Sequence, residues 1–171
     1  MKAVLSQLEK EPVGILHLRR STPAYVRVIE YDQLPKKGSI EQVFGKHKAV
    51  IILYTMHSEG KQVDGTGHYA CLTKEGKHVM YFSSYGLAPG AEIAATHSDP
   101  SRLRLLLGKN AIVSKSRMQS KYHTATCGRW AYARAVLADL PLKSFVQFFG
   151  GRLHLKTADE IVSLATIFAI R

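Results

Sequence analysis

Three β-prone runs lie close together in the middle of the chain, and they constrain the fold more than any other feature. The first, from Ala49 to Met56, is apolar almost throughout and predicts a buried strand. The second, from His68 to Thr73, and the third, from His78 to Ser84, flank the turn sequence Lys-Glu-Gly-Lys, which predicts a β-hairpin. The glycine-rich stretch from Ser58 to Gly67 is expected to be the loop that joins the first two strands.

The final third of the chain has helical character. Residues Ala131 to Leu140 are rich in helix formers and contain no glycine or proline, so a helix is expected to start near Cys127. Four other segments are also expected to be helical, because each carries a cap, a glycine stop or a helical composition. They are Ser39 to Gly45, Ser101 to Leu107, Leu142 to Phe149 and a last helix capped by Thr157 and Glu160. The pattern predicts an α+β fold with a strand-rich middle and a helix-rich end.

The size of the chain sets the number of domains. With 171 residues, 46% of them hydrophobic, residues 1–171 are expected to form a single domain around one continuous core. No run approaches the roughly 18 apolar residues that a membrane span needs. Glu9, Lys10 and Glu11 interrupt the apolar stretch that a signal peptide would need, so we expect a protein that is not secreted and stays inside the cell.

Cysteine and histidine usage argues against a metal site. The two cysteines, Cys71 and Cys127, are too few for a disulfide framework and do not form a metal-binding pair. The eight histidines are scattered and lack the spacing of a structural zinc site. No metal or cofactor is expected. Cys71, inside the second strand, is interpreted as ordinary packing.

The formal net charge of +11 suggests a polyanionic partner, because basic residues that neutralise phosphates release counterions. The basic residues form small groups and not one stripe, so a solvated basic surface is an equally open interpretation. The candidates for contact with nucleic acid lie close to Cys127 in the sequence. They are Lys115, Arg117, Lys121 and Arg129.

Cys127 stands where a Ser/Thr-rich loop gives way to the expected helix. The thiolate is the reactive form of cysteine, and a helix N-terminus stabilises it through the macrodipole and free N–H groups, which lowers the pKa from about 8.5. Gly128 allows a substrate backbone to approach closely. A buried structural cysteine is the alternative interpretation.

Two further residues fit a cysteine nucleophile. His68, at the edge of the second strand, could take the proton of the thiol and form a thiolate–imidazolium pair. Gln119, upstream of Cys127, could donate to a tetrahedral oxyanion together with the backbone N–H of the cysteine. Taken singly, a histidine without a role or a surface glutamine would look the same.

The order of these residues resembles the adenovirus-type cysteine endopeptidases, their relatives in virophages and Maverick/Polinton elements, and more distantly the SUMO and ubiquitin-like-protein proteases. The segments that carry the resemblance are His68-Tyr69, Phe82 to Gly86, Gln119 and Cys127-Gly128. The resemblance implies a papain-like fold of the adenovirus-protease type, in which a central mixed sheet packs against a helix that starts at the nucleophile. It also implies cleavage after a small residue, often glycine.

One position departs from the family pattern. Ser83 occupies the place where the family usually has the acid that orients the histidine. A serine hydroxyl can accept a hydrogen bond from the imidazole, but it lacks the charge that stabilises imidazolium. Asp64 and Glu59, in the expected loop before His68, are conceivable substitutes.

The leading expectation is a virus-encoded cysteine endopeptidase that cleaves capsid or core precursor proteins during virion maturation. It would act in the virion or the interior of the host cell, without a membrane, and with viral DNA as a second partner. One alternative is a catalytically weak, nucleic-acid-binding virion protein on the same fold. Another is a deubiquitinase-like or SUMO-protease-like enzyme.

Overall fold

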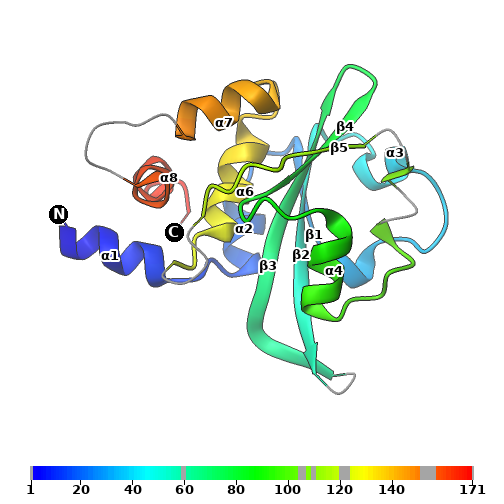
Figure 1. The fold of residues 1–171 in the computed structure, drawn as a ribbon, viewed down its shortest axis with the longest axis horizontal. Helices are drawn as coiled ribbons and strands as arrows, with labels where there is room; N and C mark the ends of the chain where they lie inside the picture. Colours follow the sequence, from blue (N-terminus) through cyan, green and yellow to red (C-terminus); the bar gives the residue numbers. More distant parts are fainter. Residues whose placement is uncertain are drawn as a thin grey trace.

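One mixed sheet divides the structure into two layers of helices (Figure 1). The computed structural model describes residues 2–58, 61–103, 107–108, 111–119, 124–150 and 157–170. The five strands lie in the order in which they occur in the sequence. They are β1 (Val26–Glu30), β2 (Ala49–Ser58), β3 (Lys61–Glu75), β4 (His78–Ser83) and β5 (Ala111–Val113).

Strand directions follow from the connections. β2, β3 and β4 are antiparallel, and β3 and β4 form the hairpin that the sequence predicts. β1 pairs with β2 in parallel, and β5 pairs with β4 in parallel, because helical crossovers lead from β1 to β2 and from β4 to β5. The result is a mixed sheet with parallel pairs at both edges, and an α+β fold as expected.

The described residues contain seven α-helices and a short 3-10 helix. The α-helices are α1 (Lys2–Lys10), α2 (Ile15–Ser21), α3 (Ile40–Phe44), α4 (Pro89–Thr96), α6 (Cys127–Val136), α7 (Leu142–Gly150) and α8 (Ala158–Thr166), and the 3-10 helix is η1 (Tyr31–Gln33). α6, α7, α8 and α1 lie on one side of the sheet, and α3 and α4 lie on the other (Figure 1).

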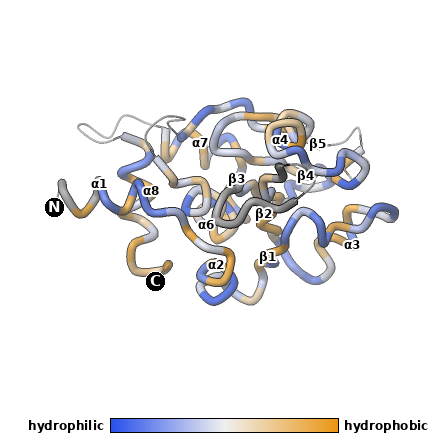
Figure 2. The backbone as a smooth tube through the Cα atoms, turned by 90° about the horizontal axis from the view of Figure 1, so that it is seen from below, coloured by the Kyte–Doolittle hydropathy of each residue, from blue (hydrophilic) through white to orange (hydrophobic). Residues whose placement is uncertain are grey.

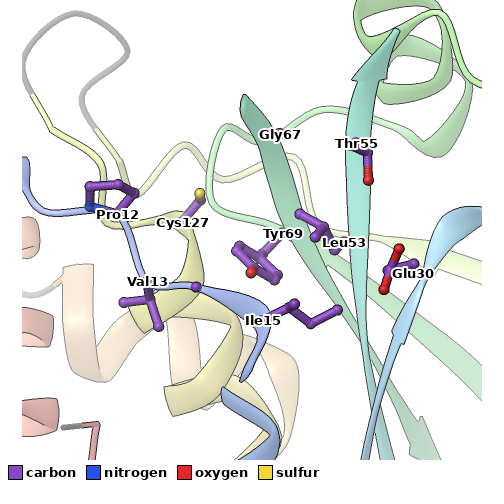
Figure 3. A pocket seen from close by; sticks show the side chains of 10 residues that line it. Pro12, Val13, Ile15, Glu30, Leu53, Thr55, Gly67, Tyr69 and Cys127 are labelled. Atoms are coloured by element: carbon purple, nitrogen blue, oxygen red, sulfur yellow. The ribbon is translucent and has the colours of Figure 1, made fainter. Parts of the chain in front are cut away.

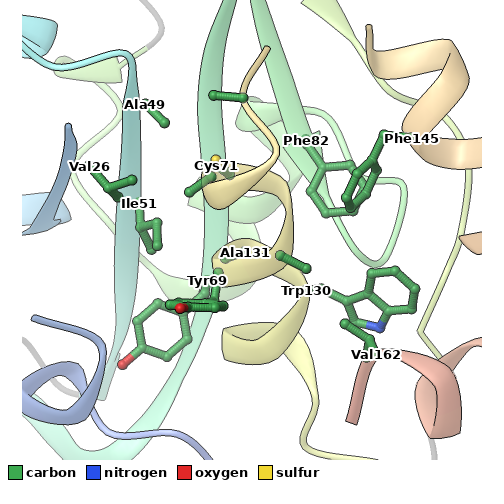
Figure 4. Close-up of a cluster of buried hydrophobic side chains, with 14 of the residues drawn as sticks. Val26, Ala49, Ile51, Tyr69, Cys71, Phe82, Trp130, Ala131, Phe145 and Val162 are labelled. Atoms are coloured by element: carbon green, nitrogen blue, oxygen red, sulfur yellow. The ribbon is translucent and has the colours of Figure 1, made fainter. Parts of the chain in front are cut away.

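Each face of the sheet has its own apolar cluster. Under α6, Trp130 and Phe149 meet edge to face with their ring centroids 5.3 Å apart, and Phe82 contacts Phe145 in the same way (Figure 4). On the opposite face, Tyr31 stacks on a neighbouring buried tyrosine within a second cluster. The expectation of one continuous core was therefore wrong, because the sheet separates two cores.

Several predicted elements are confirmed. α3 begins after Ser39, and α8 begins after Thr157, each with a capping box. α6 begins at Cys127, and α7 occupies the segment after Pro141. The expected helix from Ser101 to Leu107 lies partly outside the described residues.

The glycine-rich stretch that was expected to be a loop is strand instead. β2 continues to Ser58, and β3 begins at Lys61, so the two strands pair almost to the tip of a long hairpin. A register shift between Thr55 and His57 accommodates the irregular sequence. Backbone pairing overrode the local preference of the glycines for turns.

Within the described part of the chain, no helix has the length and apolar character required to cross a membrane.

Candidate active site

Cys127 is the first residue of α6 and lies beside β3. Thr126 precedes the helix but makes no side-chain cap, because its hydroxyl donates to Asp159 of α8. The N–H groups of the first turn are therefore left for another acceptor. The backbone N–H groups of Tyr69, Gly128 and Cys127 lie near the Cys127 sulfur and favour its anionic form.

Asp159 holds the segment that leads into Cys127. Its buried carboxylate accepts hydrogen bonds from Thr124 and Thr126, and its Oδ1 lies 2.9 Å from the indole Nε1 of Trp130. These contacts tie the loop, the start of α6 and α8 together. The position of the Cys127 backbone is thus fixed from the side away from the sheet.

Burial outweighs the helix N-terminus in setting the pKa of the Cys127 thiol. Burial raises this pKa to about 11, while the N–H groups of Tyr69 and Gly128 act in the opposite direction. The expected lowering of the thiol pKa is therefore not found. In the resting protein Cys127 is a neutral thiol near pH 7.

His68 lies on β3 directly before the residue whose N–H meets the Cys127 sulfur. Its ring is buried and stacks on Tyr85, with 4.4 Å between the centroids. Burial lowers the pKa of the imidazole to about 3, so the ring is neutral near pH 7. The sequence suggested a thiolate–imidazolium pair in the resting protein. The structure instead favours a neutral thiol and a neutral imidazole.

A buried carboxylate stands behind His68. His68 Nε2 lies 3.2 Å from Ser83 Oγ and 3.3 Å from Glu92 Oε1. The Ser83 hydroxyl donates to the same Glu92 oxygen over 2.5 Å. Ser83 therefore contacts His68 as expected, and Glu92 of α4 places a carboxylate beside the imidazole, where this chain has no acid at position 83.

Proton counting selects one tautomer of His68. The single Ser83 hydroxyl hydrogen goes to Glu92, so Ser83 Oγ and Glu92 Oε1 can both only accept from the imidazole. The ring proton must then reside on Nε2. His68 Nδ1 is buried and has no hydrogen-bond partner among the described residues, so its lone pair is free. In this tautomer Nδ1 is the ring atom that can take a proton.

The sequence alone does not single out Glu92, because the stretch from Leu87 to Pro100 contains two prolines and a glycine and resembles a turn-rich loop. It contains α4, which has Pro89 in its first turn and Glu92 close behind. Proline followed by an acidic residue is a helix-start signal that could have revealed the element. The positive end of the helix favours a negative charge on Glu92.

Gln119 is buried and held in place by its neighbours. Its amide oxygen accepts from the Ser84 hydroxyl at 2.7 Å, and its Nε2 donates to the Thr124 carbonyl at 3.0 Å. A longer contact of 3.4 Å joins Nε2 to the Tyr85 hydroxyl. Gln119 thus connects the end of β4 to the loop before Cys127, with one N–H only weakly engaged.

A pocket of about 340 Å³ opens next to Cys127 (Figure 3). Its walls come from the segment between α1 and α2 and from the strands β2 and β3. Figure 3 shows Cys127 and Pro12 at one end and Glu30 at the other, with Tyr69 and Leu53 between them. The nucleophile candidate therefore faces a space that a ligand could fill.

The remaining candidates fall into different environments. The side chains of Asp64, Glu59 and Lys121 lie outside the part of the chain that the structure describes. Lys115 and Arg117 are exposed. Arg129 is buried, and its guanidinium donates to Thr166, so its interpretation as a contact for nucleic acid was wrong. Cys71 is fully buried within the core under α6, as expected.

The hydrophilic stretches of the backbone are spread over α1, α2 and α3 and do not gather on one face (Figure 2). Among the described residues, no group of three histidine, cysteine or acidic side chains is arranged to hold a metal ion.

Comparison with known proteins gives one relevant similarity. The chain is 27% identical over 155 residues to uncharacterized protein V9 of Sputnik virophage, and the alignment covers 82% of this chain and 85% of the relative. No protein-family model matches the chain. The similarity is to a virophage protein and names no activity.

Proposed function

We propose that this protein is a cysteine endopeptidase of the adenovirus-protease type, with a papain-like fold, that cleaves capsid or core precursor proteins of a virus. The observation that carries the proposal is the His68–Ser83–Glu92 arrangement on β3, β4 and α4. It leaves one nitrogen of a neutral imidazole without a hydrogen-bond partner among the described residues, while the thiol of Cys127, at the N-terminus of α6, lies near Tyr69, the residue that follows His68 on β3. The similarity to a virophage protein agrees with a viral substrate.

In the proposed reaction, His68 Nδ1 takes the proton of Cys127 as the sulfur attacks the scissile carbonyl carbon. The imidazolium that forms is stabilised by Glu92, directly and through the Ser83 hydroxyl. His68 then gives this proton to the leaving amine, and an acyl-enzyme remains on Cys127. A water molecule, deprotonated by His68, releases the acyl group and restores the thiol.

The carbonyl oxygen becomes an oxyanion in the tetrahedral intermediate. The N–H groups at the start of α6 and the side-chain amide of Gln119 are the donors proposed for it. The weak contact from Gln119 Nε2 to Tyr85 is the one that the oxyanion would replace, while the contacts with Ser84 and Thr124 keep the amide in place.

Replacing Gln119 by alanine is expected to lower kcat by about a hundredfold and to change KM much less, because the lost donor acts mainly on the oxyanion. Steady-state kinetics on a cleaved precursor peptide would measure both values. Gln147→Ala is a matched control, since it removes the same side chain from an exposed position on α7. An unchanged kcat for Gln119→Ala would assign the oxyanion contact to another group.

The primary test is incubation of the purified protein with the capsid and core proteins encoded beside it, followed by mass spectrometry of the new termini. Cleavage that depends on Cys127 supports the proposal. A parallel panel of ubiquitin-like fusion proteins separates it from a SUMO-protease-like or deubiquitinase-like enzyme. Cleavage of the fusions alone would reject the viral substrate.

A second candidate function is binding of viral DNA, which the net charge of +11 and the exposed pair Lys115 and Arg117 favour. Affinity for duplex DNA is expected to fall as salt rises, with a slope of about −0.9 for each phosphate contacted, and to be independent of base sequence. The double variant Lys115→Ala, Arg117→Ala should reduce this slope by about two. A fluorescence-anisotropy titration at several salt concentrations measures it.

The matched control for DNA binding is the pair Lys36→Ala, Lys37→Ala, which removes the same charge from another exposed site. Equal slopes for both double variants would mean that the overall charge, and not the Lys115–Arg117 site, attracts DNA. A titration without salt dependence would rule out DNA binding through phosphates.

A further inference from the structure

The floor of the pocket beside Cys127 is a part of the sheet that α6 does not cover. Leu53 pairs with Tyr69, and Thr55 pairs with Gly67, so these four residues lie on one face of β2 and β3. α6 covers the same face further along the strands and begins only at Cys127. Beyond its N-terminus the pocket lies over these strand residues, and Gly67 brings no side chain to it.

The wall opposite the sheet is the segment between α1 and α2, and it is packed firmly in place. A Cβ atom on Gly128 would lie only 2.9 Å from Cβ of Val13, so the segment touches the first turn of α6. The N–H of Ala125 also donates to the Glu9 carbonyl at the end of α1. Pro12, Val13 and Ile15 therefore present a fixed apolar wall.

A carboxylate closes the far end of the pocket. Glu30 is the last residue of β1 and lies across the pocket from Cys127 (Figure 3). Its one ion pair among the described residues is with Arg19, whose Nη2 lies 3.5 Å from Glu30 Oε1. Charge-assisted hydrogen bonds are usually shorter, at about 2.7–2.9 Å. Both side chains are also about a third exposed, and the Glu30 carboxylate accepts the backbone N–H of Gln33 as well. The ion pair with Arg19 is therefore loose, and the carboxylate can accept a second cation.

We propose that this pocket binds a lysine or arginine side chain of the polypeptide substrate. The aliphatic stem would lie along Leu53, Tyr69 and Ile15, and the cationic end would reach Glu30. Long basic side chains bury their stems on apolar surfaces and keep the charged end near a polar group, which is the chemistry that this pocket offers. An aliphatic side chain would fill the walls but leave the carboxylate unused.

The overall positive charge of the protein does not oppose this selectivity. At an ionic strength of about 0.1 M, charges further apart than about 10 Å are largely screened. Within that range the pocket has Glu30 and its loose partner Arg19, so a basic side chain would bind by taking the place of the Arg19 guanidinium on the Glu30 carboxylate. The consequence for cleavage, a preference for a basic residue at a fixed distance from the scissile bond, rests on the proposed function.

Binding can be tested without catalysis. In the Cys127→Ala background, Nα-acetyl-lysine methylamide should perturb the backbone amide NMR signals of Gly67 and Tyr69, and bind about tenfold more tightly than the norleucine analogue, since a partly buried charge-assisted contact contributes roughly this much. Glu30→Gln should remove the difference. Glu41→Gln, which removes an equal charge at an exposed site on α3, should leave it unchanged.

Cleavage gives the second readout. The protein with Cys127 intact is incubated with proteome-derived peptides prepared by cleavage after glutamate, so that lysine and arginine remain internal, and the new termini are sequenced by mass spectrometry. We expect enrichment of lysine or arginine at one position relative to the cut. Glu30→Gln should abolish the enrichment, and Glu30→Lys should replace it by enrichment of acidic residues.

The two readouts separate the two proposals. Cleavage without any basic preference, or with a preference that survives Glu30→Gln, would overturn the pocket assignment and leave the protease proposal intact. Lysine-selective binding that depends on Glu30, with no peptide cleaved, would support the pocket and count against the protease. Equal binding of the lysine and norleucine analogues would reject the pocket assignment whether or not peptides are cleaved.

Discussion

Cys127→Ala is expected to lower turnover of precursor peptides by about a millionfold, as loss of the nucleophile does in a serine protease triad. Alanine is a good helix former, so α6 should begin at the same place. The Asp159 contacts that fix the preceding loop do not involve the cysteine side chain. Steady-state kinetics and thermal unfolding of the purified variant would measure both effects.

The matched control is Cys71→Ala. Burial raises the pKa of this thiol to about 12 and keeps it away from solvent, so its loss should reduce stability and leave kcat per folded molecule unchanged. Alkylation of Cys127 in the free enzyme should be slow near pH 7 and accelerate as the pH rises towards about 11, the pKa that burial gives it. Loss of activity in Cys71→Ala, with Cys127→Ala still active, would reverse the assignment.

Glu92→Gln is expected to lower kcat by about a thousandfold to ten-thousandfold, comparable with neutralising the orienting acid of a serine protease triad. Burial already holds the pKa of His68 near 3, so the imidazolium formed during the reaction depends on a compensating negative charge. Removing that charge lowers the pKa of His68 further and raises the energy of the charged transition state. KM should change little, because Glu92 is behind the imidazole and makes no substrate contact in the proposed mechanism.

Ser83→Ala distinguishes the two ways in which Glu92 can stabilise the His68 imidazolium, by direct contact and through the Ser83 hydroxyl. The direct contact of 3.3 Å between Glu92 Oε1 and His68 Nε2 remains in this variant, so the loss in kcat should be about tenfold, the value of one hydrogen bond to a charged group. Imidazole ¹⁵N shifts, recorded in the Cys127→Ala background, should show the proton on Nε2 with Glu92 present and a mixture of tautomers in Glu92→Gln. A lower melting temperature with unchanged kcat and unchanged shifts would give Glu92 a purely structural role.

Ser83→Asp would not simply restore the acid that the family usually has at this position. The Ser83 hydroxyl lies 2.5 Å from Glu92, so a carboxylate at position 83 would face another one in a buried site. Two carboxylates at such a distance cannot both stay ionised. Glu92 already provides the carboxylate beside His68, so position 83 accommodates a neutral hydroxyl better than a second acid.

Local sequence signals determined much of the fold. The capping boxes at Ser39 and Thr157, the hairpin turn between β3 and β4, and the loop-to-helix transition at Cys127 each depend on interactions a few residues apart, and each is found in the structure. Cys127, His68 and Gln119 were selected by residue type and by their order in the chain, which resembles that of the adenovirus-type proteases, and their roles as nucleophile, base and oxyanion donor stay predictions.

Only the tertiary structure decided which other groups surround these residues and how their pKa values are shifted. Glu92 lies on a helix that packs across the sheet from α6, and its distance to His68 depends on how far β3, β4 and α4 approach one another. The high pKa of Cys127 and the low pKa of His68 come from burial, which depends on the whole packed structure. The pocket that ends at Glu30 requires the N-terminal segment to fold back onto α6. Neither the long-range contacts nor the exclusion of solvent produces a periodic pattern or a local motif that can be recognised in the sequence.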